Sequence, residues 1–231
     1  MAQSKGGRVD FRVRVPHSNH RDSMIESAES QDDAGLSEVV ERTRGIQPWR
    51  RVFHVANGTF IVLALTVLDL DVSTAVVILG VILTFGMVVD AVRLYDPKVN
   101  TLFFRAFSSL ASPREAKKIA SSTWYALSVF LVLLFFPTTY AIAGVLVLAW
   151  ADPAASVVGQ RWGKTPFLSG TIRGTATFAV VAFFALLIFV PWKASMVTAL
   201  AAAIVEAAPL ELDDNLIVPL TVAGVLLLIG V

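Results

Sequence analysis

The segment Trp150–Gly174 reads WADPAASVVGQRWGKTPFLSGTIRG and joins two long apolar runs of the chain. Its acid, Asp152, lies inside the first of these runs. An ionisable residue within a membrane-length apolar segment is energetically costly, so it indicates a functional site. An acid that can bind a metal, glycines that let backbone approach a ligand and nearby cations together indicate a phosphate-binding site. The glycines and cations of the segment are Gly159, Arg161, Gly163, Lys164, Gly170, Arg173 and Gly174.

The composition is typical of a membrane protein. Hydrophobic residues make up 55% of the 231 residues and charged residues 16%, and the mean hydropathy is +0.69. Soluble domains are about 45–50% apolar and about 25% charged. The charges of this chain lie mostly in short clusters between apolar runs. The pattern predicts an all-α fold, a polytopic bundle of transmembrane helices.

Net charge and cysteine content exclude several functions. The net charge of +1 gives no basic surface of the kind that nucleic-acid-binding proteins use. The chain has no cysteine, which excludes disulfides, thiolate metal sites and a cysteine nucleophile.

The apolar runs predict about seven spans. They cover approximately residues 52–68, 72–89, 123–136, 140–158, 175–190, 196–208 and 216–231. The third and sixth are short for a bilayer core about 30 Å thick, which leaves the count open by one. The polar residues 1–47 predict a disordered tail, and residues 48–231 form the predicted transmembrane domain.

The charges of the loops predict how the spans are oriented. Lys and Arg cluster before the first span, between the second and third, and between the fourth and fifth. Three other connections, with the sequences DLD, PTT and PWK, hold one cation among them. Cytoplasmic loops carry an excess of Lys and Arg, so the N-terminus and the cation-bearing loops are predicted to be cytoplasmic.

Five polar clusters fall at membrane boundaries on this predicted cytoplasmic side. Although they are separate in sequence, they can converge in a helical bundle. Acids and cations that share one partly desolvated place can bind Mg²⁺ together with phosphates. The clusters are Arg50, Arg51 and His54; Asp90 and Arg93; Asp152, Gly159, Arg161 and Lys164; Arg173; and Glu206, Asp213, Asp214 and Asn215.

Several of these residues also have other interpretations. Asp152 can be a buried acid paired with Arg93 or Arg173, or part of a transporter's proton relay. The acids of Asp213–Asn215 precede an apolar run and can simply cap a helix N-terminus. His54 is a candidate general base, a phosphate donor or a structural histidine.

The stretch Gly159–Thr165 reads GQRWGKT and superficially matches a Walker A loop. That motif needs four residues between its glycine and its Gly-Lys pair, and this stretch has three. No predicted strand precedes it. The P-loop interpretation is therefore excluded, and what remains is backbone amides and a lysine near a phosphate.

Four motifs together resemble the CTP-dependent lipid kinase family, which includes dolichol kinase, phytol kinase and the CTP-dependent diacylglycerol kinase. They are RRxxH from Arg50, DxxR from Asp90, DPAASVVGxxxGK from Asp152, and a C-terminal Glu206 followed by DDNLxVP from Asp213. Their order and spacing match the family from Arg50 to the C-terminus. Where the family usually has Lys-(Ser/Thr)-x-Glu-Gly, this chain has GTIRG over Gly170–Gly174, which alters the charge pattern there.

The resemblance implies a membrane enzyme that transfers the γ-phosphoryl group of CTP to the hydroxyl of a lipid alcohol: polyprenol (dolichol), phytol or diacylglycerol. It implies Mg²⁺ as cofactor. Because the GTIRG stretch departs from the family pattern, the choice between CTP and ATP as phosphoryl donor stays open. The implied metal ligands are Asp152 and Asp214, supported by Asn215 and Asp213, and the candidate bases are Asp152, His54 and Asp213. The implied nucleotide- and phosphate-binding residues are Arg50, Arg51, Gly159, Gly163, Lys164, Arg173 and Gly174, with Asp90, Arg93 and Glu206 in support.

Two other functions would use similar groups. A cytidylyltransferase would make a CDP-lipid from a phosphatidate-like substrate and release pyrophosphate. An ion-coupled transporter would use Asp152 and Glu206 as carriers, but it needs polar residues near mid-membrane on several spans and usually repeat symmetry. The ionisable residues here lie at one boundary, which favours an enzyme. The sequence identifies neither the lipid nor the oligomeric state.

Overall fold

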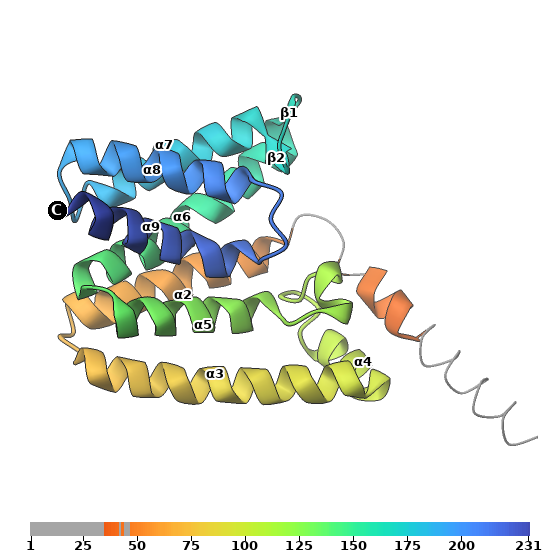
Figure 1. Ribbon diagram of the computed structural model, residues 1–231. Helices are drawn as coiled ribbons and strands as arrows, with labels where there is room; N and C mark the ends of the chain where they lie inside the picture. Colours follow the sequence, from red (N-terminus) through yellow and green to blue (C-terminus); the bar gives the residue numbers. More distant parts are fainter. Residues whose placement is uncertain (1–34, 42, 44–46) are drawn as a thin grey trace, which may run out of the picture.

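The structure, a computed structural model, describes residues 35–41, 43 and 47–231. The described chain is helical almost throughout, which confirms the predicted all-α class (Figure 1). Most of the predicted tail over residues 1–47 lies outside the described residues, and residues 35–41 are helical. The elements are α2 (Pro48–Thr66), α3 (Val72–Tyr95), α4 (Pro97–Ala106), the 3₁₀ helix η1 (Pro113–Lys117), α5 (Ser121–Phe135), α6 (Thr138–Trp162), β1 (Pro166–Phe167), β2 (Gly170–Thr171), α7 (Ile172–Leu186), α8 (Trp192–Ala207) and α9 (Asp214–Ile229).

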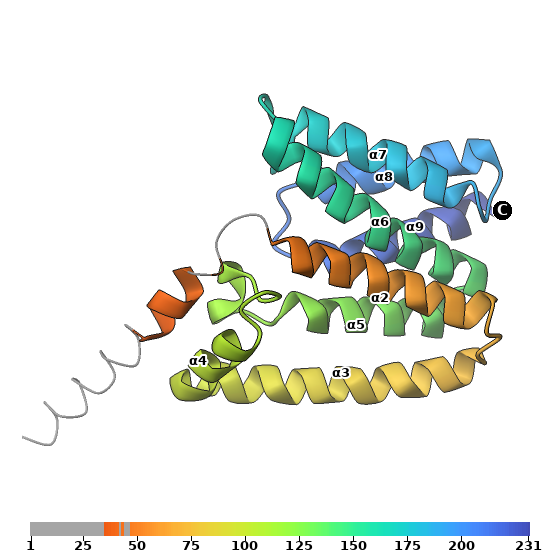
Figure 2. The ribbon, with the colours of Figure 1, turned by 180° about the vertical axis from the view of Figure 1, so that it is seen from behind.

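The long helices run side by side, and their connections gather at two ends of the bundle (Figures 1 and 2). One end holds the tight turns α2–α3, α5–α6 and α7–α8 together with the C-terminus. The other end holds the start of α2, the α3–α5 connection (residues 96–120), the β1–β2 hairpin and the α8–α9 loop (residues 208–213). All five polar clusters of the sequence lie toward this second end, as the alternation of the spans predicts.

α6 is the central helix of the bundle. It packs against α2, α5, α7 and α9, and every residue from Ala141 to Ala149 is buried. A helix that is apolar on all sides belongs in an interior, which is why this stretch lacks an amphipathic pattern. The last part of α6 then carries Asp152 out of this core toward the polar end of the bundle.

α6 and α9 approach each other closely at Gly144. A Cβ at this position would lie 2.8 Å from the carbonyl oxygen of Pro219 and 3.1 Å from its Cα. Both atoms belong to the backbone of α9, so they cannot move without displacing the helix. Small residues allow such close backbone approach between membrane helices.

We expect Gly144→Ala to destabilise the bundle by about 1–3 kcal/mol, because the added methyl overpacks the contact with α9. Gly224→Ala in α9 is the matched control, since a Cβ there meets no atom within 4 Å. Alanine favours a helix over glycine by about 1 kcal/mol at either position, so the difference between the two variants isolates the contact. Thermal unfolding in detergent micelles measures that difference, and equal midpoints would contradict the close approach.

α3 lies at the edge of the bundle and packs mainly on α5. Its buried apolar residues are Ala75, Leu79 and Leu83, and most of its other side chains are exposed. Within the described part of the chain, α3 and α6 are the two helices long and apolar enough to cross a membrane, with 24 and 25 residues.

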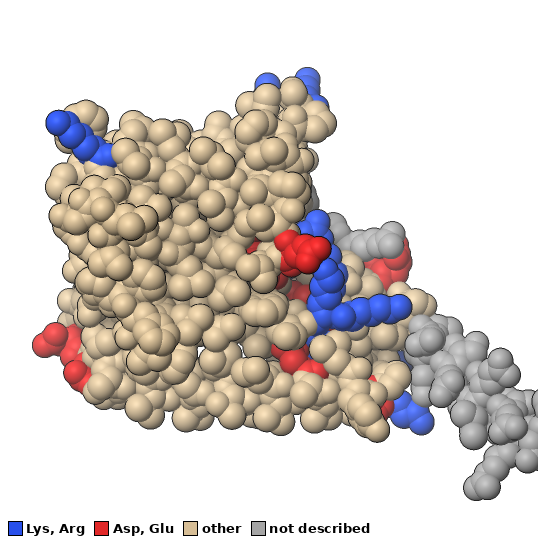
Figure 3. Space-filling model, viewed as in Figure 1, with Lys and Arg blue, Asp and Glu red and all other residues tan. Residues whose placement is uncertain are grey.

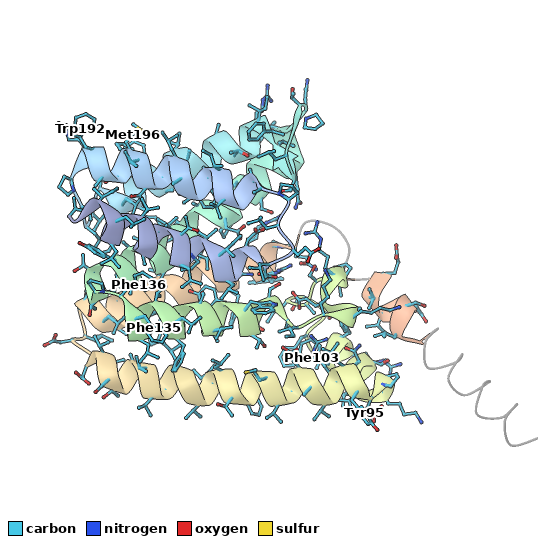
Figure 4. All side chains as sticks on the ribbon, viewed as in Figure 1. Tyr95, Phe103, Phe135, Phe136, Trp192 and Met196 are labelled. Carbon is cyan, nitrogen blue, oxygen red and sulfur yellow. The ribbon has the colours of Figure 1, made fainter. Side chains whose placement is uncertain are left out.

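The outer surface of the bundle is apolar along its middle and charged at its ends. Figure 3 shows Lys, Arg, Asp and Glu gathered at the end with the long connections, and few elsewhere on that face. Tyr95, 91% exposed, and Trp192, 60% exposed, lie near opposite ends of the bundle (Figure 4). Exposed aromatic residues at both ends and a wide apolar surface between them are typical of a protein embedded in a bilayer.

Candidate active site

A cavity of about 1110 Å³ opens at the polar end of the bundle. This end cavity is formed by α2, the α3–α5 connection, α6, the hairpin and the α8–α9 loop. The structure brings most of the predicted site residues together in it, but five lie outside its lining: Asp90, Arg93, Gly163, Lys164 and Arg173. The predicted residues that line it are Arg50, Arg51, His54, Asp152, Gly159, Gly174, Glu206, Asp213, Asp214 and Asn215.

α6 contributes one face to the end cavity. Asp152, Ser156 and Gly159 are spaced by four and three residues, so they lie on the same side of the helix. Arg51 of α2 reaches this face and donates from Nη2 to Ser156 Oγ at 2.9 Å. This hydrogen bond holds the guanidinium of Arg51 near Asp152, and the two opposite charges interact.

Two side-chain nitrogen atoms of α2 are buried without a hydrogen-bond partner. They are Nη1 of Arg51 and Nε2 of His54. The His54 ring packs edge-on against Tyr125, with 4.9 Å between the ring centroids. Buried polar atoms are nearly always hydrogen-bonded, so two such atoms in one cavity indicate a ligand that forms hydrogen bonds with them.

A hydrogen-bonded chain links the start of α2 to the start of α9. Arg50 donates from Nη2 to Ser121 Oγ at 2.9 Å, and the same Nη2 lies 3.5 Å from Glu115 Oε1. Ser121 in turn donates to Asp213 Oδ2 at 3.4 Å. Burial raises the pKa of Glu115, and the positive charge of Arg50 opposes the rise.

Asp213 is the N-cap of α9. Its Oδ1 accepts from the backbone amide of Asn215 at 3.0 Å and from Asn215 Nδ2 at 2.6 Å. The capping interpretation of Asp213 is therefore confirmed, and its carboxylate is largely occupied. Asn215 is buried by the same contact.

Three other acids of the end cavity have carboxylates that are not taken up by hydrogen bonds of this kind. Asp152, Glu206 and Asp214 form no ion pair with a described residue, and Asp152 and Asp214 each act electrostatically on Glu206. Like charges held together favour a bound cation. No group of three or more acids or histidines among the described residues is placed to enclose a metal ion. Mg²⁺ fits this arrangement, because it is usually held by one or two carboxylates, with water and substrate phosphates completing its shell.

The glycines of the central segment surround one threonine. Thr171 caps α7 by accepting from the amide of Gly174 at 3.1 Å. A Cβ at Gly159 would lie 3.2 Å from Thr171 Oγ1, and one at Gly163 would lie 2.5 Å from the same atom. The structure therefore uses these glycines for close packing of α6 and α7, and their predicted role in nucleotide approach stays a prediction.

We expect Gly163→Ala to lower stability by about 1–3 kcal/mol, because its methyl group would overlap both Thr171 and the carbonyl of Gly159. Gly170→Ala, on the hairpin that follows Gly163, is the control, since the nearest atom to its Cβ is 4.0 Å away. Thermal unfolding of both variants gives the comparison. A Gly163→Ala protein as stable as the Gly170→Ala protein would refute the packing role.

Two predicted phosphate ligands beside the hairpin, Lys164 and Arg173, do not line the end cavity. Ser169 at its turn donates from both its amide and its Oγ to the carbonyl of Ala207, at 2.9 Å each. Arg173 donates from Nη1 to the carbonyl of Trp162 at the end of α6. Lys164 and Arg173 are exposed and absent from the cavity lining, so their role in phosphate binding is still a prediction.

Asp90 and Arg93 form a buried ion pair, with 2.6 Å between Arg93 Nη2 and Asp90 Oδ1. Arg93 is fully buried. Since Arg93 pairs with Asp90 and Arg173 bonds to a carbonyl, neither arginine pairs with Asp152. The structural interpretation of Asp152 as their partner is thereby excluded.

Three curated relatives carry the name CTP-dependent diacylglycerol kinase 1. The protein of Eremothecium gossypii is 34% identical over 121 residues, which cover 52% of this chain and 38% of that protein. The protein of Schizosaccharomyces pombe is 28% identical over 162 residues, covering 61% of this chain and 74% of the relative. That of Saccharomyces cerevisiae is 27% identical over 173 residues, covering 69% and 56% respectively.

The resemblance to the CTP-dependent lipid kinase family is confirmed. The chain spans 38% of the first of these relatives and 56% of the third. No family model matches this chain, and no solved structure is significantly similar to it.

Sequence reasoning missed several residues of the end cavity. Ser121, Ser156 and Ser169 each hold a charged side chain or a backbone segment at the end cavity. Isolated serines form no pattern in a sequence, so nothing pointed to them. Glu115 gave a weak signal, as an acid among cations in the α3–α5 connection.

Proposed function

We propose that this protein is a membrane-embedded kinase that transfers the γ-phosphoryl group of CTP to the hydroxyl of a lipid alcohol. The end cavity carries the proposal, because it combines unpaired acids with the unpartnered nitrogen atoms of Arg51 and His54. The names of the relatives support CTP as the donor and make diacylglycerol the first lipid to test. Polyprenol and phytol offer the same hydroxyl and are the alternatives.

We further propose that seven helices cross the bilayer, with the N-terminus and the end cavity on the cytoplasmic side. CTP is a cytosolic metabolite, and the connections at the cavity end carry most of the Lys and Arg residues. Helices of 15 or 16 residues, such as α5 and α9, extend about 22–24 Å. A bilayer core of about 30 Å must therefore thin around them, which brings lipid headgroups close to the cavity.

The proposed reaction is an in-line displacement at the γ-phosphorus. The lipid hydroxyl oxygen forms a bond to the γ-phosphorus, the bond to the β–γ bridging oxygen breaks, and CDP leaves with that electron pair. Such a transfer depends on positioning and charge neutralisation more than on covalent chemistry. Arg51 would bind phosphate oxygens through its unpartnered Nη1, and Arg50, which is bonded to Ser121, would contribute its positive charge.

The cofactor fits the acids of the end cavity. Asp152 and Asp214 would hold Mg²⁺, supported by Asn215, and the ion when bound neutralises charge on the transferred phosphate. Of the three candidate bases, Asp213 is occupied as the cap of α9. Asp152 and His54 are left to accept the proton of the lipid hydroxyl, and a His54→Gln variant distinguishes them.

Transfer of radioactive label from CTP tests this function. Purified protein in nanodiscs receives Mg²⁺, diacylglycerol, a polyprenol or phytol, and CTP labelled on either the γ- or the α-phosphate. We expect label in the lipid fraction from γ-labelled CTP only. Label from α-labelled CTP with release of pyrophosphate would indicate a cytidylyltransferase instead. No labelled lipid from either form, with folded protein, would contradict both enzymes and leave the transporter as the function to test.

A further inference from the structure

The α3–α5 connection places three cations on the lining of the end cavity that no motif singled out. Arg114, Lys117 and Lys118, here named the cationic wall, are all exposed and all line the cavity. They supply three of the five Lys and Arg residues in its lining, the other two being Arg50 and Arg51. The lining also holds six acids: Glu115, Asp152, Glu206, Glu211, Asp213 and Asp214. Without the cationic wall the acids would greatly outnumber the cations, and a nucleoside triphosphate would be repelled.

The backbone that carries the cationic wall is fixed from inside the protein. The buried Arg93 donates to the carbonyl of Glu115 at 2.8 Å and to that of Lys118 at 2.6 Å. Asn100 Nδ2 donates to the carbonyl of Ala116 at 2.8 Å. The amide of Ala120 donates to Asp90 at 3.1 Å. Four bonds to residues 115–120 therefore hold the segment in one conformation, which keeps the three cations at the cavity.

The cationic wall adjoins the cations of α2. Arg50 lies 3.5 Å from Glu115, which stands between Arg114 and Lys117 in sequence, so the segment that carries the wall contacts the start of α2. None of the three wall side chains forms an ion pair with a residue that the structure describes. Arg114 is near enough to Asp214 to interact with its charge. The wall is thus adjacent to the proposed metal ligand and still free to bind an anion.

We propose that the cationic wall, together with Arg50 and Arg51, binds the triphosphate of CTP. Asp90 and Arg93 then act as positioning residues, since they hold the wall and do not line the cavity. The inference rests on the proposed function and assigns the phosphate subsite to the α3–α5 connection. It keeps Arg50 and Arg51 from the sequence prediction and puts the wall in place of Lys164 and Arg173, which do not line the cavity.

Equilibrium binding of α-labelled CTP to the full chain in nanodiscs, without lipid alcohol, tests the inference. The wall variant is Arg114→Gln/Lys117→Gln. Its matched control is Lys98→Gln/Arg105→Gln, which removes one Lys and one Arg from the same connection but outside the cavity lining. A charge-conserving variant, Arg114→Lys/Lys117→Arg, tests whether charge is what matters. All four replaced side chains are exposed, so we expect every variant to fold. Thermal midpoints check that expectation.

We expect the Kd for CTP to rise about tenfold or more in the wall variant, because two charge-assisted contacts with the triphosphate are lost. The matched control and the charge-conserving variant should bind like the wild type. Inorganic triphosphate should displace CTP from the wild type at lower concentration than from the wall variant. In steady-state assays KM for CTP should rise with little change in kcat, which a general structural defect would not produce.

Two results would overturn the inference. The first is a wall variant that binds CTP with the same Kd as the wild type and still transfers the phosphoryl group. The second is a raised Kd for CTP in Lys164→Gln/Arg173→Gln together with an unchanged Kd in the wall variant. That result would move the phosphate subsite to the hairpin. If the wild type itself binds no CTP, the proposed function fails, and this inference fails with it.

Discussion

Replacing Asp152 with asparagine is expected to lower kcat for phosphoryl transfer from CTP by about 10³-fold. The variant keeps the size of the side chain but removes its negative charge. We propose that this carboxylate binds the metal ion and accepts the proton of the lipid hydroxyl. Asp152 forms no ion pair with a described residue, so its loss breaks no salt bridge. The initial rate of label transfer from γ-labelled CTP measures the effect, and thermal unfolding establishes that the variant is folded.

Asp69→Asn is the matched control for this prediction. Asp69 is an exposed acid in the α2–α3 turn, at the opposite end of the bundle from the cavity. Its φ of 53° lies in the left-handed region, which asparagine tolerates as well as aspartate does. The control should retain full activity. An Asp152→Asn protein that is equally active would remove Asp152 from the chemistry.

Replacing Arg93 with methionine is expected to destabilise the protein by about 3–5 kcal/mol, because it leaves Asp90 buried without a counter-charge. It also removes the hydrogen bonds to the carbonyls of Glu115 and Lys118. The α3–α5 connection loses its anchor, so we expect weaker CTP binding as well as a lower thermal midpoint. Thermal unfolding in micelles and CTP binding below the midpoint measure the two effects separately.

Two further variants delimit the effect of Arg93. Arg105→Met removes an exposed arginine of α4 and should leave the midpoint nearly unchanged. The double variant Asp90→Leu/Arg93→Met replaces the whole pair by apolar groups and should recover much of the lost stability, since no buried charge is left. An Arg93→Met protein as stable as Arg105→Met would show that the pair does not hold the connection.

The helices could be predicted from the sequence because their cause is local. Apolar runs bounded by Pro, Gly and charged residues form helices at nearly the expected positions, as in α6, predicted over 140–158 and observed over Thr138–Trp162. The gathering of the polar clusters at one end also follows from sequence, since alternate connections of antiparallel helices must meet. Asp152, Glu206 and Asp214 were found in this way.

What the sequence could not show depends on side-chain direction. The glycines near Asp152 indicated backbone open to a ligand, yet Gly159 and Gly163 make room for Thr171, a contact between two helices. Lys164 and Arg173 are close to the site in sequence, but they do not line the cavity, and Arg173 bonds to the carbonyl of Trp162. The cations of the α3–α5 connection are distant from Asp152 in sequence, and hydrogen bonds with Arg93, Asn100 and Asp90 hold their backbone at the cavity.

The most direct test of the account is a crystal structure of the protein with Mg²⁺ and a non-hydrolysable CTP analogue, grown from a lipidic phase. We predict nucleotide density in the end cavity, with the triphosphate between the acids Asp152 and Asp214 and the cations of α2 and η1. Nucleotide density on the outer side of the hairpin at Lys164 and Arg173, with the end cavity free of nucleotide, would contradict the account.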